Sequence, residues 1–193
     1  MCKNSKIKNI FFLIDTVMAL IKKKIILYPT DTVWGLGCDA TNEQVVKKIY
    51  KIKGRTESKS LIVLVSSIHM LKKYVSVSKN ILRFLETTVK PTTVIYQNPK
   101  GLASNVIASD NTVAIRIVQD EFCRKLIKRF GKPIVSTSAN ISNSPTPKSF
   151  QEIEPSILQR VDYIVNLHQN KTCNKPSSII KIEKDGSATI IRK

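Results

Sequence analysis

The stretch YPTDTVWGLG, residues 28–37, follows the apolar run 25–27 and guides the interpretation of the whole chain. Pro29 fixes its own φ and cannot donate a backbone hydrogen bond, so a strand over residues 25–28 is expected to end there. Thr30 and Thr32 offer hydroxyls, and Gly35 and Gly37 permit a positive φ or a close approach to a ligand. The pattern favours a strand that stops at a binding site, with an Asx-type turn after an edge strand as the alternative.

Strand-like and helix-like segments alternate through the rest of the sequence. This alternation is typical of an α/β or α+β fold built on one twisted sheet, and 193 residues suit a single domain over residues 1–193. The expected strands are 25–28, 61–65, 92–96, 112–118, 134–137, 161–165, 178–182 and 188–192, and the expected helices are 41–53, a segment that begins at Ser78, 121–130 and 149–160.

Local signals mark the ends of several of these helices. Thr41 with Gln44, and Ser149 with an acidic residue three positions later, have the spacing of capping boxes. Gly131 is well suited to end the helix 121–130 in a left-handed conformation.

The first 24 residues contain an apolar core between lysines, as signal peptides do, but Asp15 interrupts it and no small-residue cleavage site follows. We expect an amphipathic helix instead, with its inner face formed by Ile10, Leu13, Ile14, Val17, Leu20 and Ile21. No apolar run approaches the roughly 20 residues of a membrane span, so no membrane association is expected.

The chain is strongly basic, with a formal net charge of +18. Such a charge favours a polyanionic partner such as RNA, DNA or a nucleoside triphosphate. The alternative is a compositional habit in which lysines fill exposed positions along the whole chain. The four cysteines form no CxxC pair and fit free thiols in a reducing cytoplasm; they are Cys2, Cys38, Cys123 and Cys173.

Lys53 and Arg55 flank Gly54 at the end of the expected helix 41–53, and Lys59 follows. Arginine offers a planar fork and lysine a point charge, so together they can hold a triphosphate. The alternative is a favourable interaction of these cations with the dipole at the helix C-terminus.

Arg116 interrupts the apolar run VAIRIV, residues 113–118. Strand alternation places Arg116 on the face opposite to Val113, Ile115 and Ile117. A cation on a central strand is costly without a partner, and we expect a ligand anion or carboxylate in preference to a structural aspartate.

The stretch STSAN, residues 136–140, follows the apolar residues Pro133–Val135. Three hydroxyls and one amide at the end of a strand can cradle phosphate or sugar oxygens. Other strand ends, at Thr30, Arg116 and Arg192, also carry polar groups, so a ligand cleft is expected along one side of the sheet.

Several familiar catalytic patterns are missing from the sequence. There is no P-loop, GxGxxG or HExxH motif, and His69 and His168 belong to no triad and are expected on the surface or in loops. A site made of cations and hydroxyls suits positioning and charge neutralisation at phosphorus, as in nucleotidyl transfer.

Taken together, these segments resemble the YrdC-like family of threonylcarbamoyl-AMP synthases. The similar blocks are YPTDTVWGLG, KGR followed by LIVLV, VAIRIV, PIVSTSANIS, PSSII at 176–180 and IIR at 190–192, in order over residues 25–192. Departures from the family pattern are Thr56 in place of a proline, Val89–Thr93 without the glycine of a Pro-Gly-Pro block, Leu64 in place of a histidine and Lys181 in place of an acid.

The resemblance implies a twisted mixed β-sheet flanked by helices, with a large cationic cavity, in the short single-domain form. It also implies a nucleotidyltransferase: threonine and bicarbonate give threonylcarbamate, which attacks the α-phosphate of ATP and releases pyrophosphate. The same resemblance implies ATP as a substrate, with Mg²⁺ bound to the ATP. It further implies a partner transferase that modifies the adenosine beside the anticodon of tRNA.

The resemblance also assigns roles by position. Lys53 and Arg55 are implied as catalytic cations on the ATP phosphates. Threonine or carbamate contacts are implied for Thr30, Arg116, Ser136 and Ser177, and ATP contacts for Lys53, Arg55, Thr112, Ser138, Asn140 and Arg192. No residue is assigned to a metal, and Asp31 is either a metal ligand or a turn residue.

Two other functions stay open from the sequence. One is a non-catalytic module that binds double-stranded RNA or serves ribosome maturation, which the charge of +18 favours. The other is a related carbamoyltransferase module, which generally belongs to a longer multidomain chain.

Overall fold

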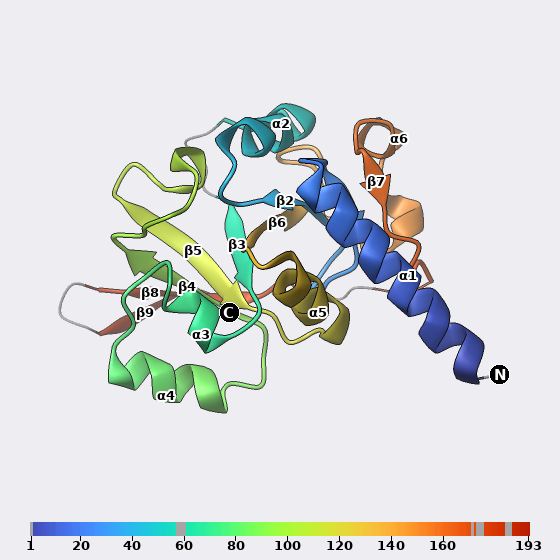
Figure 1. Ribbon diagram of the computed structural model, residues 1–193. Helices are drawn as coiled ribbons and strands as arrows, with labels where there is room; N and C mark the ends of the chain where they lie inside the picture. The colour runs from blue at the N-terminus through green and yellow to red at the C-terminus, as the bar shows by residue number, and fades with distance from the viewer. Residues whose placement is uncertain (1, 57–60, 171, 173–175, 184–186) are drawn as a thin grey trace.

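The strands of the computed structural model form one mixed sheet with helices around it (Figure 1), and this confirms the expected fold class. The structure describes residues 2–56, 61–170, 172, 176–183 and 187–193. In chain order the elements are α1 (Cys2–Ile21), β1 (Ile26–Tyr28), β2 (Gly35–Asp39), α2 (Glu43–Lys53), β3 (Ile62–Val65), α3 (Ile68–Leu71), α4 (Lys79–Thr87), β4 (Thr92–Gln97), the 3₁₀ turn η1 (Ser104–Val106), β5 (Thr112–Ile117), α5 (Glu121–Phe130), β6 (Ile134–Ser138), the 3₁₀ turn η2 (Phe150–Glu152), α6 (Pro155–Leu158), β7 (Tyr163–Ile164), β8 (Ser178–Ile182) and β9 (Ala188–Arg192).

Within the described residues the sheet has nine strands, in the order β7-β1-β2-β6-β3-β5-β4-β8-β9. The pairs β1–β7, β3–β5 and β4–β8 are parallel, and the remaining neighbours are antiparallel. Strands that are distant in sequence therefore lie next to each other, which is how one side of the sheet can gather residues from four separate motifs.

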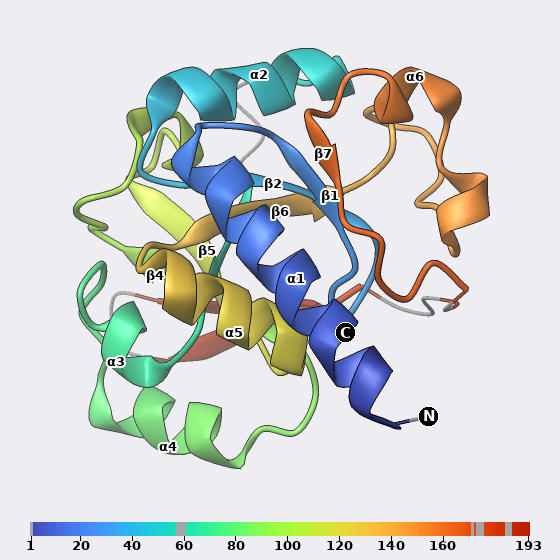
Figure 2. The same cartoon turned by 45° about the vertical axis from the view of Figure 1, so that its right-hand side comes forward.

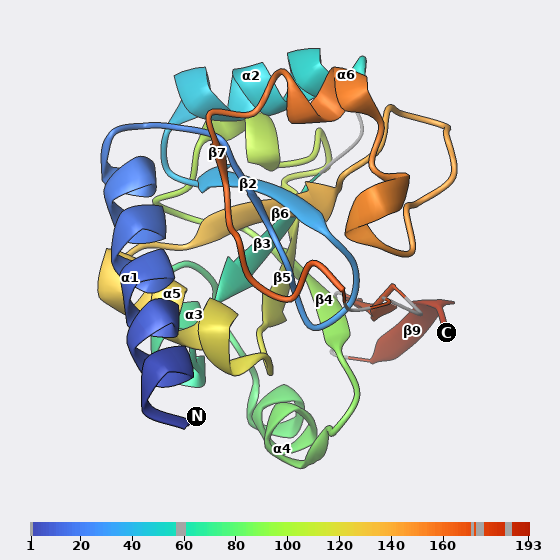
Figure 3. The same ribbon diagram turned by 90° about the vertical axis from the view of Figure 1, so that its right-hand side faces the viewer.

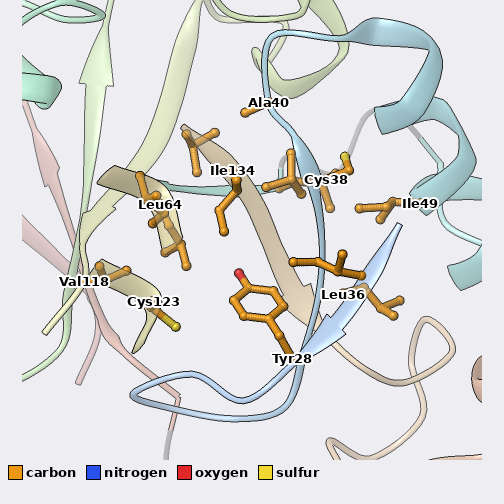
Figure 4. Close-up of a cluster of buried hydrophobic side chains, with 14 of the residues drawn as sticks. Tyr28, Leu36, Cys38, Ala40, Ile49, Leu64, Val118, Cys123 and Ile134 are labelled. Atoms are coloured by element: carbon orange, nitrogen blue, oxygen red, sulfur yellow. The ribbon is translucent and has the colours of Figure 1, made fainter. Parts of the chain in front are cut away.

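The helices enclose the sheet unevenly. Helices α1 and α5 pack against each other on one side of the strands, whereas β9 lies on the other side (Figure 3). In Figure 2 the N-terminal part of α1 extends beyond the neighbouring elements. The core between these layers is fully buried and includes Tyr28, Leu36, Leu64, Cys123 and Ile134 (Figure 4).

The structure confirms two of the expected helix ends. The Ser78 hydroxyl accepts a hydrogen bond from the Ile81 backbone N–H at 3.4 Å and caps α4. Gly131 ends α5 with φ 80°, the left-handed conformation that glycine adopts at no steric cost. The predicted strands also match the observed ones, apart from small shifts at their ends.

Only half of the residues predicted for the inner face of α1 are buried. Leu13, Val17 and Leu20 are buried as predicted, but Ile14 is exposed, and Ile10 and Ile21 are more than half exposed. Thr16 and Ala19 take part in the buried face instead, because α1 turns a different side toward α5 and β1 than apolar spacing alone indicates.

The predicted N-cap of α2 was also wrong. Asn42, not Thr41, is the N-cap, and its side-chain oxygen accepts from the Val45 N–H at 3.2 Å. The Thr41 hydroxyl donates to Asp39 at 2.6 Å, so it serves the preceding turn. The apolar residues Val45, Val46, Ile49 and Ile52 form the buried face of α2.

The expected helix 149–160 does not form as one element. Residues 150–152 make the 3₁₀ turn η2, and α6 has only four residues. The Glu152 carboxylate accepts from the Lys148 N–H at 2.8 Å rather than from Ser149, and Pro155 starts α6 at a position where it cannot continue an earlier helix.

Strand β2 was not predicted, because Gly35 and Gly37 were interpreted as positions for a positive φ or a close approach to a ligand. Neither glycine has a positive φ. A Cβ at Gly37 would lie 2.6 Å from Tyr28 Cε1 and 3.0 Å from the Val135 carbonyl oxygen. The expected close approach to a ligand was therefore wrong for Gly37, because its close neighbours are the core ring of Tyr28 and the backbone of β6.

The described cysteine and histidine side chains agree with the sequence-based expectations. Cys38 and Cys123 are buried free thiols, whereas Cys173 and the side chain of Cys2 lie outside the described part. His69 and His168 are exposed. Among the described helices, none combines the length and the apolar character needed to cross a bilayer.

Candidate active site

A cavity of about 370 Å³ lies where the blocks identified in the sequence meet. Three arginines reach it, Arg55, Arg116 and Arg192, and no described lining residue is an aspartate or glutamate. The hydroxyl residues of its lining are Thr32, Ser136, Thr137, Ser138, Thr146 and Ser177. Its volume is at the lower end of the roughly 300–1,000 Å³ of ligand pockets.

Burial makes the cavity electrostatically unusual. Desolvation lowers the pKa of Arg55, and desolvation together with the nearby charge of Arg116 lowers the pKa of Arg192. The Arg55 guanidinium is therefore partly desolvated, and the Arg192 guanidinium is partly desolvated and close to a second cation. An anionic ligand would relieve this cost, so the electrostatics favour a ligand with several negative charges.

The PTDT loop after β1 forms one wall of the cavity. Thr30 is buried and organises the loop: its hydroxyl donates to the Val33 carbonyl at 2.7 Å and accepts from the N–H groups of Thr32 and Val33. Thr32 and Val33 line the cavity, and Thr30 does not. The sequence located this wall correctly, but Thr32 is the threonine that faces the ligand space.

Arg116 has a protein partner, which the sequence analysis did not favour. Its Nη2 lies 2.9 Å from Asp31 Oδ1, with both side chains buried, and 3.3 Å from the Thr32 hydroxyl. The preference for a ligand over a structural aspartate was therefore wrong for this edge of the guanidinium. Its Nε is buried and has no partner among the described residues.

Asp31 is fully engaged by these contacts. Its second carboxylate oxygen accepts from the Gln119 backbone N–H at 3.2 Å. Across the described part of the chain, no group of three or more histidines, cysteines, aspartates or glutamates is placed to hold a metal ion. The residues around the cavity do not fit a Mg²⁺ site made of protein carboxylates.

Lys53 ends α2 just before Gly54, whose φ of 56° turns the chain sharply. The lysine is 1% exposed, and its Nζ donates to the carbonyls of Ser138 and Asn140, each at 2.6 Å, and to Asn140 Oδ1 at 3.2 Å. All three ammonium hydrogens thus have protein acceptors. Burial, followed by the charge of Arg55, lowers the Lys53 pKa from 10.5 to about 8.

These contacts separate the two cations that the sequence paired. Arg55 lines the cavity, whereas Lys53 lies behind the wall and fixes the segment after β6. Lys59, the third cation of that block, lies outside the described residues.

The STSAN segment supplies the next wall. Ser136, Thr137 and Ser138 line the cavity, and the Ser138 hydroxyl donates to Asn140 Oδ1 at 2.6 Å. The amide of Asn140 donates to the Ser144 carbonyl at 2.6 Å, so Asn140 braces the loop and does not line the cavity.

Ser177 and Arg192 close another side. The Arg192 guanidinium donates twice to the Ser177 carbonyl, at 3.0 and 2.8 Å, and the Ser177 hydroxyl lies 2.8 Å from that of the buried Thr93. The structure thus brings both predicted residues to the cavity. Thr93 was not predicted as a site residue; it does not line the cavity but contacts Ser177 from behind.

Thr112 was predicted as an ATP contact, but it does not line the cavity. It begins β5 and its hydroxyl donates to Asp110 at 2.6 Å, whereas Ala114 and Arg116, further along the same face, line the cavity. Thr146 does line the cavity and was missed, because it stands between two prolines in a segment without periodicity.

A family model for Sua5, YciO and YrdC, described as "Telomere recombination", matches residues 18–193. This chain belongs to the Sua5/YciO/YrdC family. The match covers every block that the sequence analysis compared with YrdC-like proteins, so the resemblance is confirmed at the level of the family.

Two curated relatives place the chain within this family. It is 34% identical over 170 residues to the threonylcarbamoyl-AMP synthase of Idiomarina loihiensis, a match that covers 86% of this chain and 91% of the relative. It is 32% identical over 164 residues to the enzyme of that name from Pseudoalteromonas translucida, with 78% and 82% covered.

The family fold is also evident from a solved structure, P. abyssi Sua5 complexed with L-threonine. The TM-score is 0.83 at 24% identity, and 95% of this chain is covered. The chain spans about half of the Sua5 chain, 54% of its length. This similarity independently supports the twisted mixed sheet of the Sua5/YciO/YrdC family.

Proposed function

We propose that this chain is a threonylcarbamoyl-AMP synthase, which converts L-threonine, bicarbonate and ATP to threonylcarbamoyl-AMP, pyrophosphate and water. The observation that carries the proposal is a cavity with three arginines, a set of hydroxyl donors and no carboxylate, in a family member whose curated relatives bear that enzyme name. Such a cavity suits two anionic substrates held close together.

The reaction needs little covalent chemistry from the protein. An oxygen of the carbamate group of threonylcarbamate attacks the α-phosphorus of ATP, the bond from that phosphorus to the oxygen bridging to the β-phosphorus breaks, and pyrophosphate leaves with the negative charge. The substrate is its own nucleophile, so the protein positions both partners and stabilises charge. Arg55 has the exposure for this role because it lines the cavity.

Arg116 is suited to recognise the carboxylate of threonine. Asp31 fixes one edge of the guanidinium, and Nε remains buried without a described partner. Thr32 and Ser136 lie in the same lining and can add hydroxyl contacts. The related Sua5 structure contains L-threonine, which supports a threonine site in this fold.

Lys53 is better suited to a positioning role than to direct phosphate binding. Its three contacts hold the carbonyls of Ser138 and Asn140 and thereby set the direction of the Ser138 hydroxyl. Ser138, Ser177 and Arg192 would then contact the nucleotide, while Asn140 supports the loop from behind.

Other participants follow from the reaction. Mg²⁺ would enter as its complex with ATP, since the protein offers no carboxylate in the described lining. A partner transferase would pass the threonylcarbamoyl group to adenosine beside the anticodon of tRNA, in the cytoplasm.

The deciding experiment measures pyrophosphate release from ATP, with threonine and bicarbonate each added or withheld. We expect release only when both are present. A folded protein that binds ATP but releases no pyrophosphate under any condition would contradict the synthase and favour a binding module.

A variant pair tests the assignment of Arg55. Arg55→Ala should lower the rate of adenylate formation by at least ~10²-fold, the scale for loss of a preorganised charge donor. Lys51→Ala is the matched control, because Lys51 is an exposed cation on α2. Equal rates for the two variants would remove Arg55 from the site.

A further inference from the structure

Two arginines of the candidate active site, Arg116 and Arg192, have different electrostatic surroundings. Both line the cavity. Arg116 pairs with the buried carboxylate of Asp31 at 2.9 Å, whereas the Arg192 guanidinium donates to the neutral carbonyl of Ser177 at 3.0 and 2.8 Å. Arg192 forms no ion pair with any residue that the structure describes. The protein therefore neutralises one of these cations and leaves the other with its full charge.

Asp31 places its charge beside the cavity without entering it. It is absent from the described lining, and its side chain is only 7% exposed. One carboxylate oxygen accepts from Arg116 Nη2, and the other accepts from the Gln119 backbone N–H at 3.2 Å. Because both oxygens are used by the protein, Asp31 offers a fixed negative charge rather than a group that binds a ligand.

The fold holds both members of this ion pair in place. Arg116 lies within β5, and β3 and β4 pair with that strand on either side. The loop that carries Asp31 is fixed by the hydroxyl of Thr30, which contacts the backbone of residues 32 and 33. The pair is therefore a fixed part of the cavity wall.

Arg116 keeps hydrogen-bond donors for a ligand in spite of this pairing. Its bonds to Asp31 and to the Thr32 hydroxyl both leave from Nη2. Neither Nη1 nor Nε has a hydrogen-bond partner among the described residues. The planar fork of an arginine matches the geometry of a carboxylate, and this match does not depend on an uncompensated charge.

The charge of Asp31 acts differently on ligands of different charge. Coulomb energy is proportional to the charge of the ligand, so Asp31 repels a phosphate dianion or a triphosphate more than a single carboxylate. Water screens this difference only weakly at a buried pair. Burial and then the charge of Arg116 lower the pKa of Arg192, so the two arginines lie close together. A phosphate chain is therefore bound more favourably at Arg192 than at Arg116.

A purely structural role explains the buried pair less well. A buried ion pair is weak evidence for stability, because the cost of taking two charges out of water offsets their attraction. Apolar side chains of similar volume can replace such a pair at equal or greater stability. Beside a ligand cavity, however, the pair also controls which charge the ligand carries.

We propose that Asp31 determines which anion binds at Arg116: it favours the carboxylate of threonine at this arginine and repels phosphate groups from it. The phosphates of ATP then bind at Arg192. This inference rests on the proposed function, because it names the residue that keeps the two anionic substrates of the synthase in separate subsites. Asp31 acts through Arg116 and touches neither substrate, so it is a positioning residue.

The test is calorimetric titration of the full chain with L-threonine, with inorganic phosphate absent or in large excess at constant ionic strength. Asp31→Asn removes the charge with little change in shape, and Asp31→Glu is the conservative variant that keeps it. Thr30→Val is the matched structural control, because it removes the hydroxyl that organises the same loop and changes no charge. Circular dichroism checks that each variant folds. If Asp31→Asn does not fold, Asp31→Ser removes the same charge and takes its place.

We expect excess phosphate to raise the apparent Kd of threonine at least ~10-fold in Asp31→Asn, the scale on which one neighbouring charge acts. In the original chain and in Asp31→Glu the change should stay below about threefold. Thr30→Val should weaken threonine binding equally with and without phosphate, because it adds no positive charge to the site.

A direct titration with inorganic phosphate completes the test. Asp31→Asn should bind phosphate more tightly than the original chain, and Arg116→Gln added to Asp31→Asn should remove this gain. Equal phosphate affinity in the original chain and in Asp31→Asn, or a gain that survives the loss of Arg116, would overturn the proposal.

These titrations do not depend on turnover, so they separate the role of Asp31 from the proposed reaction. A chain that shows the gain in phosphate affinity but releases no pyrophosphate from ATP would refute the synthase and support the role of Asp31. A chain that releases pyrophosphate but shows no such gain would support the synthase and refute the role of Asp31.

Discussion

At the scale of single residues, Lys53 shows how a buried charge can build a site that it does not line. A buried ammonium is costly unless oxygens surround it, and Lys53 has three acceptors within 3.2 Å. These acceptors belong to the segment that carries Ser138 into the cavity. The lysine therefore couples the end of α2 to the end of β6.

The lowered pKa of Lys53 gives a test of this coupling that does not depend on activity. Because the folded-state pKa is about 8 and the ordinary value is 10.5, the native protein binds fewer protons than the unfolded chain between these pH values. The free energy of unfolding should therefore gain a positive slope with pH in that window. Lys53→Met should lack this contribution in urea titrations, and Lys51→Met should keep it. Identical slopes in all three proteins would refute the shift.

The site residues also show which features of the cavity could be predicted from the sequence. The sequence identified Arg55, Arg116, Ser136, Ser138, Ser177 and Arg192, which all line the cavity. It could not distinguish a lining residue from one directly behind it. Thr30 and Thr32 are chemically alike and two positions apart, and hydrogen bonds within the loop decide which one faces the cavity. The sequence also could not identify Asp31 as the partner of Arg116, because the two residues are 85 positions apart.

At the scale of elements, the periodicity of apolar residues predicted well which segments are helices or strands. It predicted poorly the helix caps and the short elements. The helices α2 and α5 and most strands appear where expected, because their apolar spacing and burial agree. Strand β2 was missed because two glycines resemble a turn, whereas Gly37 is needed for packing against Tyr28 and Gly35 lies close to the Ser136 hydroxyl. The short η2 and α6 were merged into one helix because Ser149 and Glu152 have capping-box spacing without the capping bonds.

The N-cap of α2 provides a direct comparison of the predicted and observed caps. Asn42→Ala removes the acceptor for the Val45 N–H and should lower the free energy of unfolding by about 1 kcal/mol. Gln44→Ala removes the exposed residue of the expected capping box and should change it by less than about 0.5 kcal/mol. Urea denaturation of both variants measures the difference. A larger loss for Gln44→Ala would restore the original capping assignment.

At the scale of the whole molecule, the strand order explains why a single domain remains our proposal for residues 1–193. The first and last strands in sequence, β1 and β9, belong to one sheet, and β6 lies between β2 and β3. The ends of the chain are thus linked through a shared set of strands. A sequence pattern cannot give this order, because pairings such as β2 with β6 join segments separated by about a hundred positions.

One sheet of this kind should unfold as one cooperative unit. Trp34 is the only tryptophan, is fully buried and packs on Phe150 with ring centroids 5.1 Å apart, so its fluorescence reports the region around β2. Far-UV circular dichroism reports all helices and strands. The two signals should give the same urea midpoint, because β2 cannot leave the sheet without exposing the edge of the central strand β6. Phe150→Leu is the control for the optical signal, since it changes the surroundings of Trp34 and should shift both midpoints together. A fluorescence transition that is complete before the circular dichroism changes would show instead that the part around β1 and β2 unfolds separately from β3, β5 and β4.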